Sequence, residues 1–236
     1  MFDLLSSRRD FLVAAAGASG LLASARSARS DPGARPSGRP ALDLDRFVAD
    51  CAAASRESEP QAAVLEVLAR TVRDPAAVRT ALGETTEAGI RVLHRSKTLT
   101  IFSATWTPNM TLMPHNHRMW AAIGIYSGRE DNILWRKAPE KIDAFGAKAL
   151  FAGEAAALPS DAIHSVTNPL PRFTGGIHVY GGDFFDTARS QWNPETLEEE
   201  PSDGETIRAI FRKENERMRR CGSPSSAGIS ATTAAS

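Results

Sequence analysis

The stretch over residues 90–185 most constrains the fold, because it consists of short strand-like segments separated by turn residues. Residues 98–106 alternate β-branched, aromatic and small side chains, as expected where successive side chains face opposite ways. Several short strands at close intervals are typical of an antiparallel sandwich or a small barrel. We therefore predict an all-β barrel over residues 86–190. Its other candidate strands occupy residues 119–126, 132–137, 150–158, 162–168 and 176–180.

The segments on either side of this barrel show other patterns. Residues 191–236 are polar, and we predict a surface helix over 205–220 followed by a disordered tail. Over residues 41–85 we predict a short N-terminal helical region packed on the barrel. The reason is that apolar residues recur there at helical spacings of three and four, as in Leu44, Phe47, Val48 and Cys51.

The first 40 residues carry a targeting pattern. Ser7-Arg8-Arg9-Asp10-Phe11-Leu12 precedes an Ala/Gly-rich apolar run that ends near Ala25. Paired arginines, a short apolar core and a small-residue site resemble a twin-arginine export signal, which implies a periplasmic protein. We therefore predict a signal peptide over residues 1–25 and a flexible linker over 26–40. If the N-terminus is an extension that is not a signal, the protein is cytoplasmic.

Charge and apolar content narrow the classes of partner. The chain has 28 basic and 28 acidic residues, which gives no support for binding nucleic acid or anionic membranes. The N-terminal apolar run is shorter than the roughly 20 residues of a membrane span, so no stable span is predicted. A small molecule is the expected partner, and the oligomeric state is not indicated. Cys51 and Cys221 lie far apart, which leaves two free thiols or one disulfide.

Pro114-His115-Asn116-His117 is the clearest chemical signal in the chain. Two imidazoles one residue apart on a strand share one face, and imidazole suits divalent iron, zinc, copper and nickel. The other histidines, among which we look for a third ligand, are His94, His164 and His178. His94 belongs to no motif, and we interpret it as structural. The best candidate is His164, in a segment that runs from Gly153 through Pro159 to Asn168.

Two segments around these histidines resemble the two motifs of the cupin superfamily. The first motif, Gly-x5-His-x-His-x3–4-Glu-x6-Gly, is matched by His115, His117 and Gly128, with Asn109 in place of its first glycine. The second, Gly-x5-Pro-x-Gly-x2-His-x3-Asn, is matched by Gly153, Pro159, His164 and Asn168, with Asp161 in place of its second glycine. The resemblance covers roughly residues 86–200 and implies a double-stranded β-helix, also called a cupin or jelly-roll barrel. It also implies that His115, His117 and His164 hold one metal ion.

The departure from the first motif points to a subgroup. Ala121 occupies the position of the usual glutamate ligand, and Glu130 lies beyond the turn at Gly128. A three-histidine cupin resembles the thiol dioxygenases, of which cysteine dioxygenase is the best-known member. Where that family has Ser-x-His-x-Tyr, this chain has Gly176-Ile177-His178-Val179-Tyr180. The resemblance implies Fe(II), oxidation of a small thiol to a sulfinate by O2, and a catalytic Tyr180 oriented by His178.

The sequence leaves alternatives open for the metal, for the substrate and for whether the protein is a catalyst. Arg118 follows the second histidine and could bind a substrate carboxylate, although a regular strand would turn its side chain off the ligand face. A divalent metal other than iron would also suit three histidines. The same fold could act on a non-thiol small molecule, or bind a metal or ligand without turnover.

Overall fold

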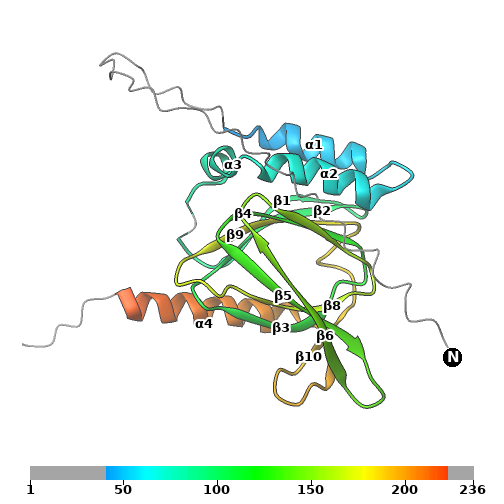
Figure 1. Ribbon diagram of the computed structural model, residues 1–236, viewed down its shortest axis with the longest axis vertical. Coiled ribbons are helices and arrows are strands. Elements are labelled where there is room, and N and C mark those ends of the chain that lie inside the picture. Colours follow the sequence, from blue (N-terminus) through cyan, green and yellow to red (C-terminus); the bar gives the residue numbers. More distant parts are fainter. Residues whose placement is uncertain (1–40, 85, 223–236) are drawn as a thin grey trace, which may run out of the picture.

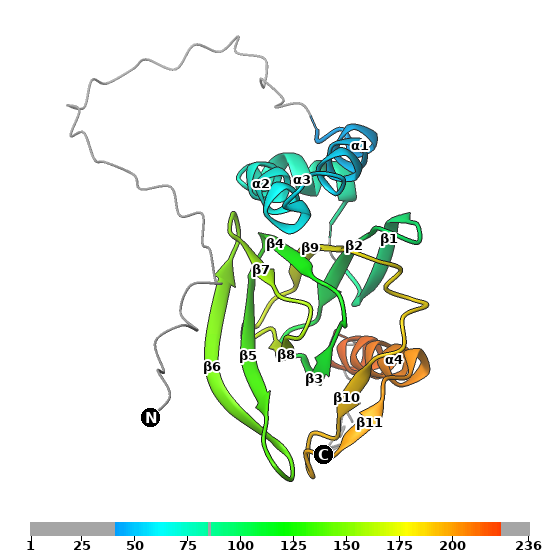
Figure 2. The ribbon, with the colours of Figure 1, turned by 90° about the vertical axis from the view of Figure 1, so that its right-hand side faces the viewer.

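A computed structural model describes residues 41–84 and 86–222 of the protein. The described chain forms three layers, which are three short helices, a five-stranded sheet and a six-stranded sheet, and its last helix lies at the open side between the two sheets (Figure 1 and Figure 2). The predicted signal peptide, linker and C-terminal tail lie outside the described residues and stay predictions. No helix within 41–84 and 86–222 is long and apolar enough to cross a membrane.

The two sheets face each other and are antiparallel throughout. The first has the order β1 (Gly89–Arg95), β2 (Thr100–Trp106), β9 (Thr174–Tyr180), β4 (Ala121–Ser127), β7 (Ala155–Leu158). The second has the order β11 (Glu199–Pro201), β10 (Ser190–Trp192), β3 (Thr111–Asn116), β8 (Ile163–Thr167), β5 (Arg129–Lys137), β6 (Ile142–Phe151).

The path of the chain between these sheets defines the fold. From β2 to β9 each strand lies in the opposite sheet to the one before it, except that β5 and β6 share a sheet. This alternation is the arrangement of a jelly roll, in which two Greek keys close face to face. The prediction of a double-stranded β-helix with a short N-terminal helical region is confirmed. The second sheet continues past residue 190, because Gln191 of β10 pairs with His115 of β3.

The helical region comprises α1 (Leu44–Ala54), α2 (Pro60–Val72) and α3 (Pro75–Leu82). Two of these helices begin at a proline, a first-turn position where the missing N–H costs nothing. The apolar face of α2 is buried on the outer side of β4. Its contact is close enough that a Cβ at Gly124 would lie 2.8 Å from Cγ of Leu68. Glycine at this position therefore lets the helix settle on the sheet.

Left-handed backbone explains three positions of the sequence motifs. Asn109, Gly128 and Gly153 have φ angles of 60°, 76° and 94°, a region that glycine and asparagine tolerate best. The turn at Gly153 also divides residues 150–158, which were predicted as one strand, between the end of β6 and the start of β7. Most of β6 was not predicted, because its outward side chains include apolar ones such as Phe145 and Phe151 and break the alternation.

The last helix, α4 (Gly204–Gly222), lies across the open side of the barrel (Figure 2). Phe211 stacks on Trp106 of β2, with ring centroids 5.6 Å apart. The side-chain amide of Asn215 accepts from the backbone N–H of Ala88 at 2.7 Å and donates to its carbonyl at 2.8 Å. One face of this helix therefore packs against the barrel. Cys221 near its end is free and exposed.

Candidate metal centre

The two sheets bring the three predicted histidines together inside the barrel. His115 of β3 and His164 of β8 are cross-strand partners, and His117 follows the end of β3. Their nearest ligand nitrogens lie within 4.8 Å of one another, and Nε2 of His117 is 3.1 Å from Nε2 of His164. All three side chains are buried. This group could hold a divalent metal ion, since three imidazoles converging on one point are a common ligand set.

Burial keeps these imidazoles neutral, which leaves their lone pairs free for a metal. Burial lowers the pKa of His115 to about 4, and it lowers the pKa values of His117 and His164 well below their usual value. The charges that the three rings would place on one another act in the same direction for His117 and His164. A protonated imidazole cannot bind a metal, so this environment favours the ligating form.

Hydrogen bonds orient two of the rings. Nδ1 of His115 donates to the carbonyl oxygen of Met113 at 3.0 Å, and Nδ1 of His164 donates to Oδ1 of Asn132 at 2.7 Å. Because these oxygens can only accept, the proton sits on Nδ1 and the lone pair on Nε2. Such partners fix the tautomer and the orientation of metal-binding histidines. Nδ1 of His117 is buried with no hydrogen-bond partner among the described residues.

Glu130 is a buried residue of the site that the sequence analysis did not assign. Its Oε1 accepts from Asn132 at 3.2 Å, and its Oε2 accepts from the indole N–H of Trp106 at 3.0 Å. The same Oε2 lies 3.5 Å from Nε2 of His178. Burial alone would raise the pKa of Glu130, but His178, Asn132 and Trp106 outweigh it and lower the pKa. One carboxylate therefore supports both the histidine cluster, through Asn132, and His178.

His178 and Tyr180 occupy the inward face of β9, beside the cluster. Nδ1 of His178 is 3.2 Å from the hydroxyl of Tyr180, and the Tyr180 ring meets the His117 ring edge to face, 4.9 Å between centroids. Burial and the charge of Glu130 raise the pKa of Tyr180, so the phenol keeps its proton at neutral pH. Gly176 lies close to His178, since a Cβ at this glycine would be 3.2 Å from Nε2 of His178. The same nitrogen faces Glu130.

Ala121 lies on the same inward face, where it is the cross-strand partner of Tyr180. The side chain is fully buried and apolar. The position that holds a glutamate ligand in the first cupin motif therefore offers the cluster no carboxylate. The described ligand set is three neutral nitrogens, which leaves the full charge of a bound divalent ion uncompensated.

The structure does not bring Arg118 to the histidines. Its φ of 54° turns the chain at the end of β3, and its guanidinium donates to Oγ of Ser190 at 3.2 Å. The side chain is 55% exposed and lies 4.0 Å from Glu199, outside the cavity that contains the histidines. Three other arginines line that cavity, Arg189, Arg208 and Arg212, and the sequence analysis assigned none of them. Arg189 stacks on Phe184 with its guanidinium carbon 3.9 Å from the ring centroid.

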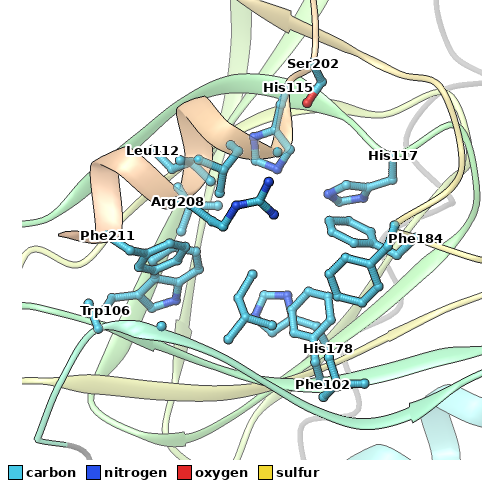
Figure 3. Close-up of a pocket in the computed structure, with 18 of the residues that line it drawn as sticks. Phe102, Trp106, Leu112, His115, His117, His178, Phe184, Ser202, Arg208 and Phe211 are labelled. Atoms are coloured by element: carbon cyan, nitrogen blue, oxygen red, sulfur yellow. The ribbon is translucent and has the colours of Figure 1, made fainter. Parts of the chain in front are cut away.

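One cavity of about 440 Å³ is lined by His115, His117, His164, His178, Tyr180, Phe184 and Arg189, among others (Figure 3). The volume is within the range of about 300–1,000 Å³ that is typical of small-molecule sites. The histidines and Tyr180 form one part of its wall, and α4 supplies another through Ile207, Arg208 and Phe211. The predicted surface helix thus encloses the candidate site, a role that its sequence did not indicate.

Comparisons with known proteins add little to this description. No protein-family model matches the sequence, and no curated protein matches it. A conserved double-stranded β-helix protein from Klebsiella pneumoniae is 13% identical, with a TM-score of 0.35 over 51% of this chain and 88% of that chain. A cupin superfamily protein from Desulfitobacterium hafniense is 12% identical, with a TM-score of 0.35 over 46% and 87%.

A third similar structure is a single-residue variant of oxalate decarboxylase from Bacillus subtilis. It is 15% identical to this chain, with a TM-score of 0.34 over 43% of this chain and 27% of that chain. Likenesses of this size carry no inference about chemistry. The fold assignment therefore rests on the strand order of the protein itself.

Proposed function

We propose that the protein is an Fe(II)-dependent dioxygenase that converts a small thiol into a sulfinate. The observation that carries the proposal is the donor set. Three neutral buried histidines converge, Ala121 stands where a carboxylate ligand would be, and Tyr180 lies beside His117. When bound, Fe(II) supplies the centre at which the thiol and O2 react.

The proposed reaction, R–SH + O2 → R–SO2H, balances without another reductant. Sulfur loses four electrons and O2 gains them. The S–H bond and the O–O bond break, two S–O bonds form, and the proton remains in the product acid. The protein therefore has to position the two substrates and stabilise the charge that develops on oxygen.

Tyr180 is suited to that second task. Its raised pKa keeps the hydroxyl protonated, and the contact with His178 fixes the position of the phenol. A fixed donor aimed at developing negative charge stabilises a transition state most strongly in a site without water. Phe102 and Phe184 pack on the Tyr180 ring, with centroids 5.2 Å and 4.4 Å away, and shield it from solvent.

Oxygen uptake tests the proposal directly. Protein loaded anaerobically with Fe(II) is mixed with O2 and a panel of small thiols, and sulfinate is measured by mass spectrometry. We expect thiol-dependent O2 uptake equimolar with sulfinate. His94→Ala removes a histidine of β1 outside the cluster and should behave like the parent protein. Iron-loaded protein that takes up no O2 with any thiol, or protein that binds only zinc or nickel, would contradict the proposal.

A further inference from the structure

Much of the cavity wall across from His117 is apolar. Trp106 and Phe211 lie on the opposite side of the cavity from His117 and Phe184 (Figure 3). The two rings stack on each other with an interplanar angle of 22°, and both line the cavity. The neighbouring wall is aliphatic and comes from Ile90, Leu112, Val166 and Ile207. Burial of an apolar group on such a surface is favourable in proportion to its area.

The charged side chains that line the cavity are all basic. Its lining contains Arg189, Arg208 and Arg212, and none of the described lining residues is an aspartate or a glutamate. The nearby Glu130 is fully buried behind His178 and already accepts from Asn132 and Trp106. An ammonium group in the cavity would therefore lose its hydration without gaining a carboxylate partner, which is costly.

Arg189 is the arginine placed to receive an anion near the histidines. A series of ring contacts connects it to them: Phe184 lies 4.4 Å from Tyr180, and Tyr180 lies 4.9 Å from His117. Its guanidinium donates to the backbone carbonyls of Phe184 and Thr187, and no carboxylate lies within ion-pair distance among the described residues. Arg208, in contrast, is 60% exposed and paired with Glu205 at 2.6 Å.

We propose that the substrate is a carboxylate with an apolar body and no ammonium group. The carboxylate would pair with Arg189, and an aryl or branched alkyl body would lie against Trp106 and Phe211. That the substrate is also a thiol rests on the proposed function, whereas the anionic and apolar parts rest on the cavity alone. An aryl-substituted mercapto acid, such as 2-mercapto-3-phenylpropanoate, combines all three features.

Binding of compounds without a thiol tests the cavity apart from the reaction. Titration of the full-length protein, followed by the fluorescence of its tryptophans and by calorimetry, compares three compounds of one size. We expect 3-phenylpropanoate to bind, and phenylalanine to bind at least about tenfold more weakly because of its ammonium. We expect 3-phenylpropan-1-ol to be weaker by a similar factor because it lacks the carboxylate. Equal binding of 3-phenylpropanoate and phenylalanine would overturn the inference.

Two arginine variants locate the anion. Arg189→Gln should weaken binding of 3-phenylpropanoate by about tenfold or more and leave 3-phenylpropan-1-ol unchanged. Arg189→Lys keeps the charge and should keep most of the affinity, which also covers the case in which the glutamine variant fails to fold. Arg136→Gln, at an exposed position of β5 outside the cavity, is the matched control and should change nothing. Unchanged affinity in folded Arg189→Gln protein would refute the role of Arg189.

Oxygen uptake with two thiols separates this inference from the proposed function. Iron-loaded protein should have a higher kcat/KM for 2-mercapto-3-phenylpropanoate than for cysteine, which carries an ammonium and no apolar body. If cysteine is the better substrate, the inference fails while the proposed function stands. If 3-phenylpropanoate binds as expected but neither thiol is oxidised, the inference about the cavity stands and the proposed function fails.

Discussion

The five-stranded sheet has two buried faces that are filled in opposite ways. On β9, Ile177 and Val179 face outward and pack under the helices, whereas His178 and Tyr180 face into the barrel. The outer side is so tightly packed that Gly124 leaves no room for a Cβ, while the inner side encloses a cavity of about 440 Å³. The outward side chains of this strand thus contribute to stability, and the inward ones line the candidate site. Substitutions on the two faces should therefore have different consequences.

The largest expected effect is on the inner side, in His164→Ala. Removal of one of three ligands should abolish stoichiometric metal binding, because two histidines and water hold a divalent ion far more weakly. Metal analysis after dialysis measures the content, and His94→Ala is the control. If the His164→Ala protein keeps one metal ion per chain, the ligand assignment is refuted.

Acid should destabilise the metal-free protein through the same inner residues. An unfolded histidine has a pKa near 6.5, whereas the pKa of folded His115 is about 4, so the unfolded chain binds more protons between these values. Stability is therefore fully present above pH 6.5 and is lost as the pH falls toward 4. The loss is about 3 kcal/mol for His115 alone, and His117 and His164 act in the same direction.

Urea unfolding of chelator-treated protein between pH 7.5 and 5 measures this dependence. A free energy of unfolding that stays constant over this range would show that the three histidines are not held neutral.

On the outer side, Leu68→Ala should lower stability without affecting the metal. Leu68 is fully buried between α2 and β4, and truncation of such a residue costs about 2–5 kcal/mol. Urea unfolding gives the free energy, and metal analysis should show unchanged occupancy. Arg70→Ala on the exposed face of the same helix should stay within about 0.5 kcal/mol of the parent protein. Loss of metal in the Leu68→Ala protein would contradict the expectation that the outer face affects stability alone.

The two tyrosines of the chain compare the faces within one residue type. Tyr180→Phe should retain metal and lower kcat by about 100-fold, the cost of removing one donor to developing charge. Tyr126 packs under the helices with its hydroxyl 3.0 Å from Oγ of Ser103, so Tyr126→Phe should leave kcat unchanged. Steady-state kinetics with the best thiol substrate decides the point. Equal rates for parent and Tyr180→Phe protein would refute a catalytic role for the phenol.

The smallest expected effect belongs to Glu130→Gln. The amide keeps an acceptor for Trp106 but loses the charge that supports Asn132 and His178, so metal affinity should fall by about tenfold to 100-fold. Competition with a chelator measures the affinity. Asp131→Asn is the control, because Asp131 points outward from the same strand and pairs with Arg129. Equal losses in both variants would indicate a general effect of β5.

The parts of the site that the sequence could predict are those that local spacing determines. The pair at residues 115 and 117, the distance from Gly153 to His164, and the alternation of His178 and Tyr180 all follow from neighbours in the chain. The left-handed turn at Gly128 could be placed for the same reason, since glycine favours that backbone. The turn at Gly153 was missed, because residues 150–158 were predicted as one strand.

The parts that could not be predicted depend on the return path of the chain. Glu130 follows a turn, and only the pairing of β5 with β8 brings it back beside the cluster. Arg189 lies in a segment without regular secondary structure, so nothing local sets its direction. Arg118 is adjacent to a candidate ligand in sequence, yet a single positive φ turns it away.

The position of α4 in the chain has a consequence for the order in which the site is completed during synthesis. All three histidines, Glu130 and Tyr180 precede residue 181, whereas the wall of α4 begins only at Gly204. Chains are synthesised from the N-terminus onward. The residues of the histidine cluster therefore leave the ribosome before those of α4, so a chain that ends before Gly204 would contain the whole cluster and lack one wall of the cavity.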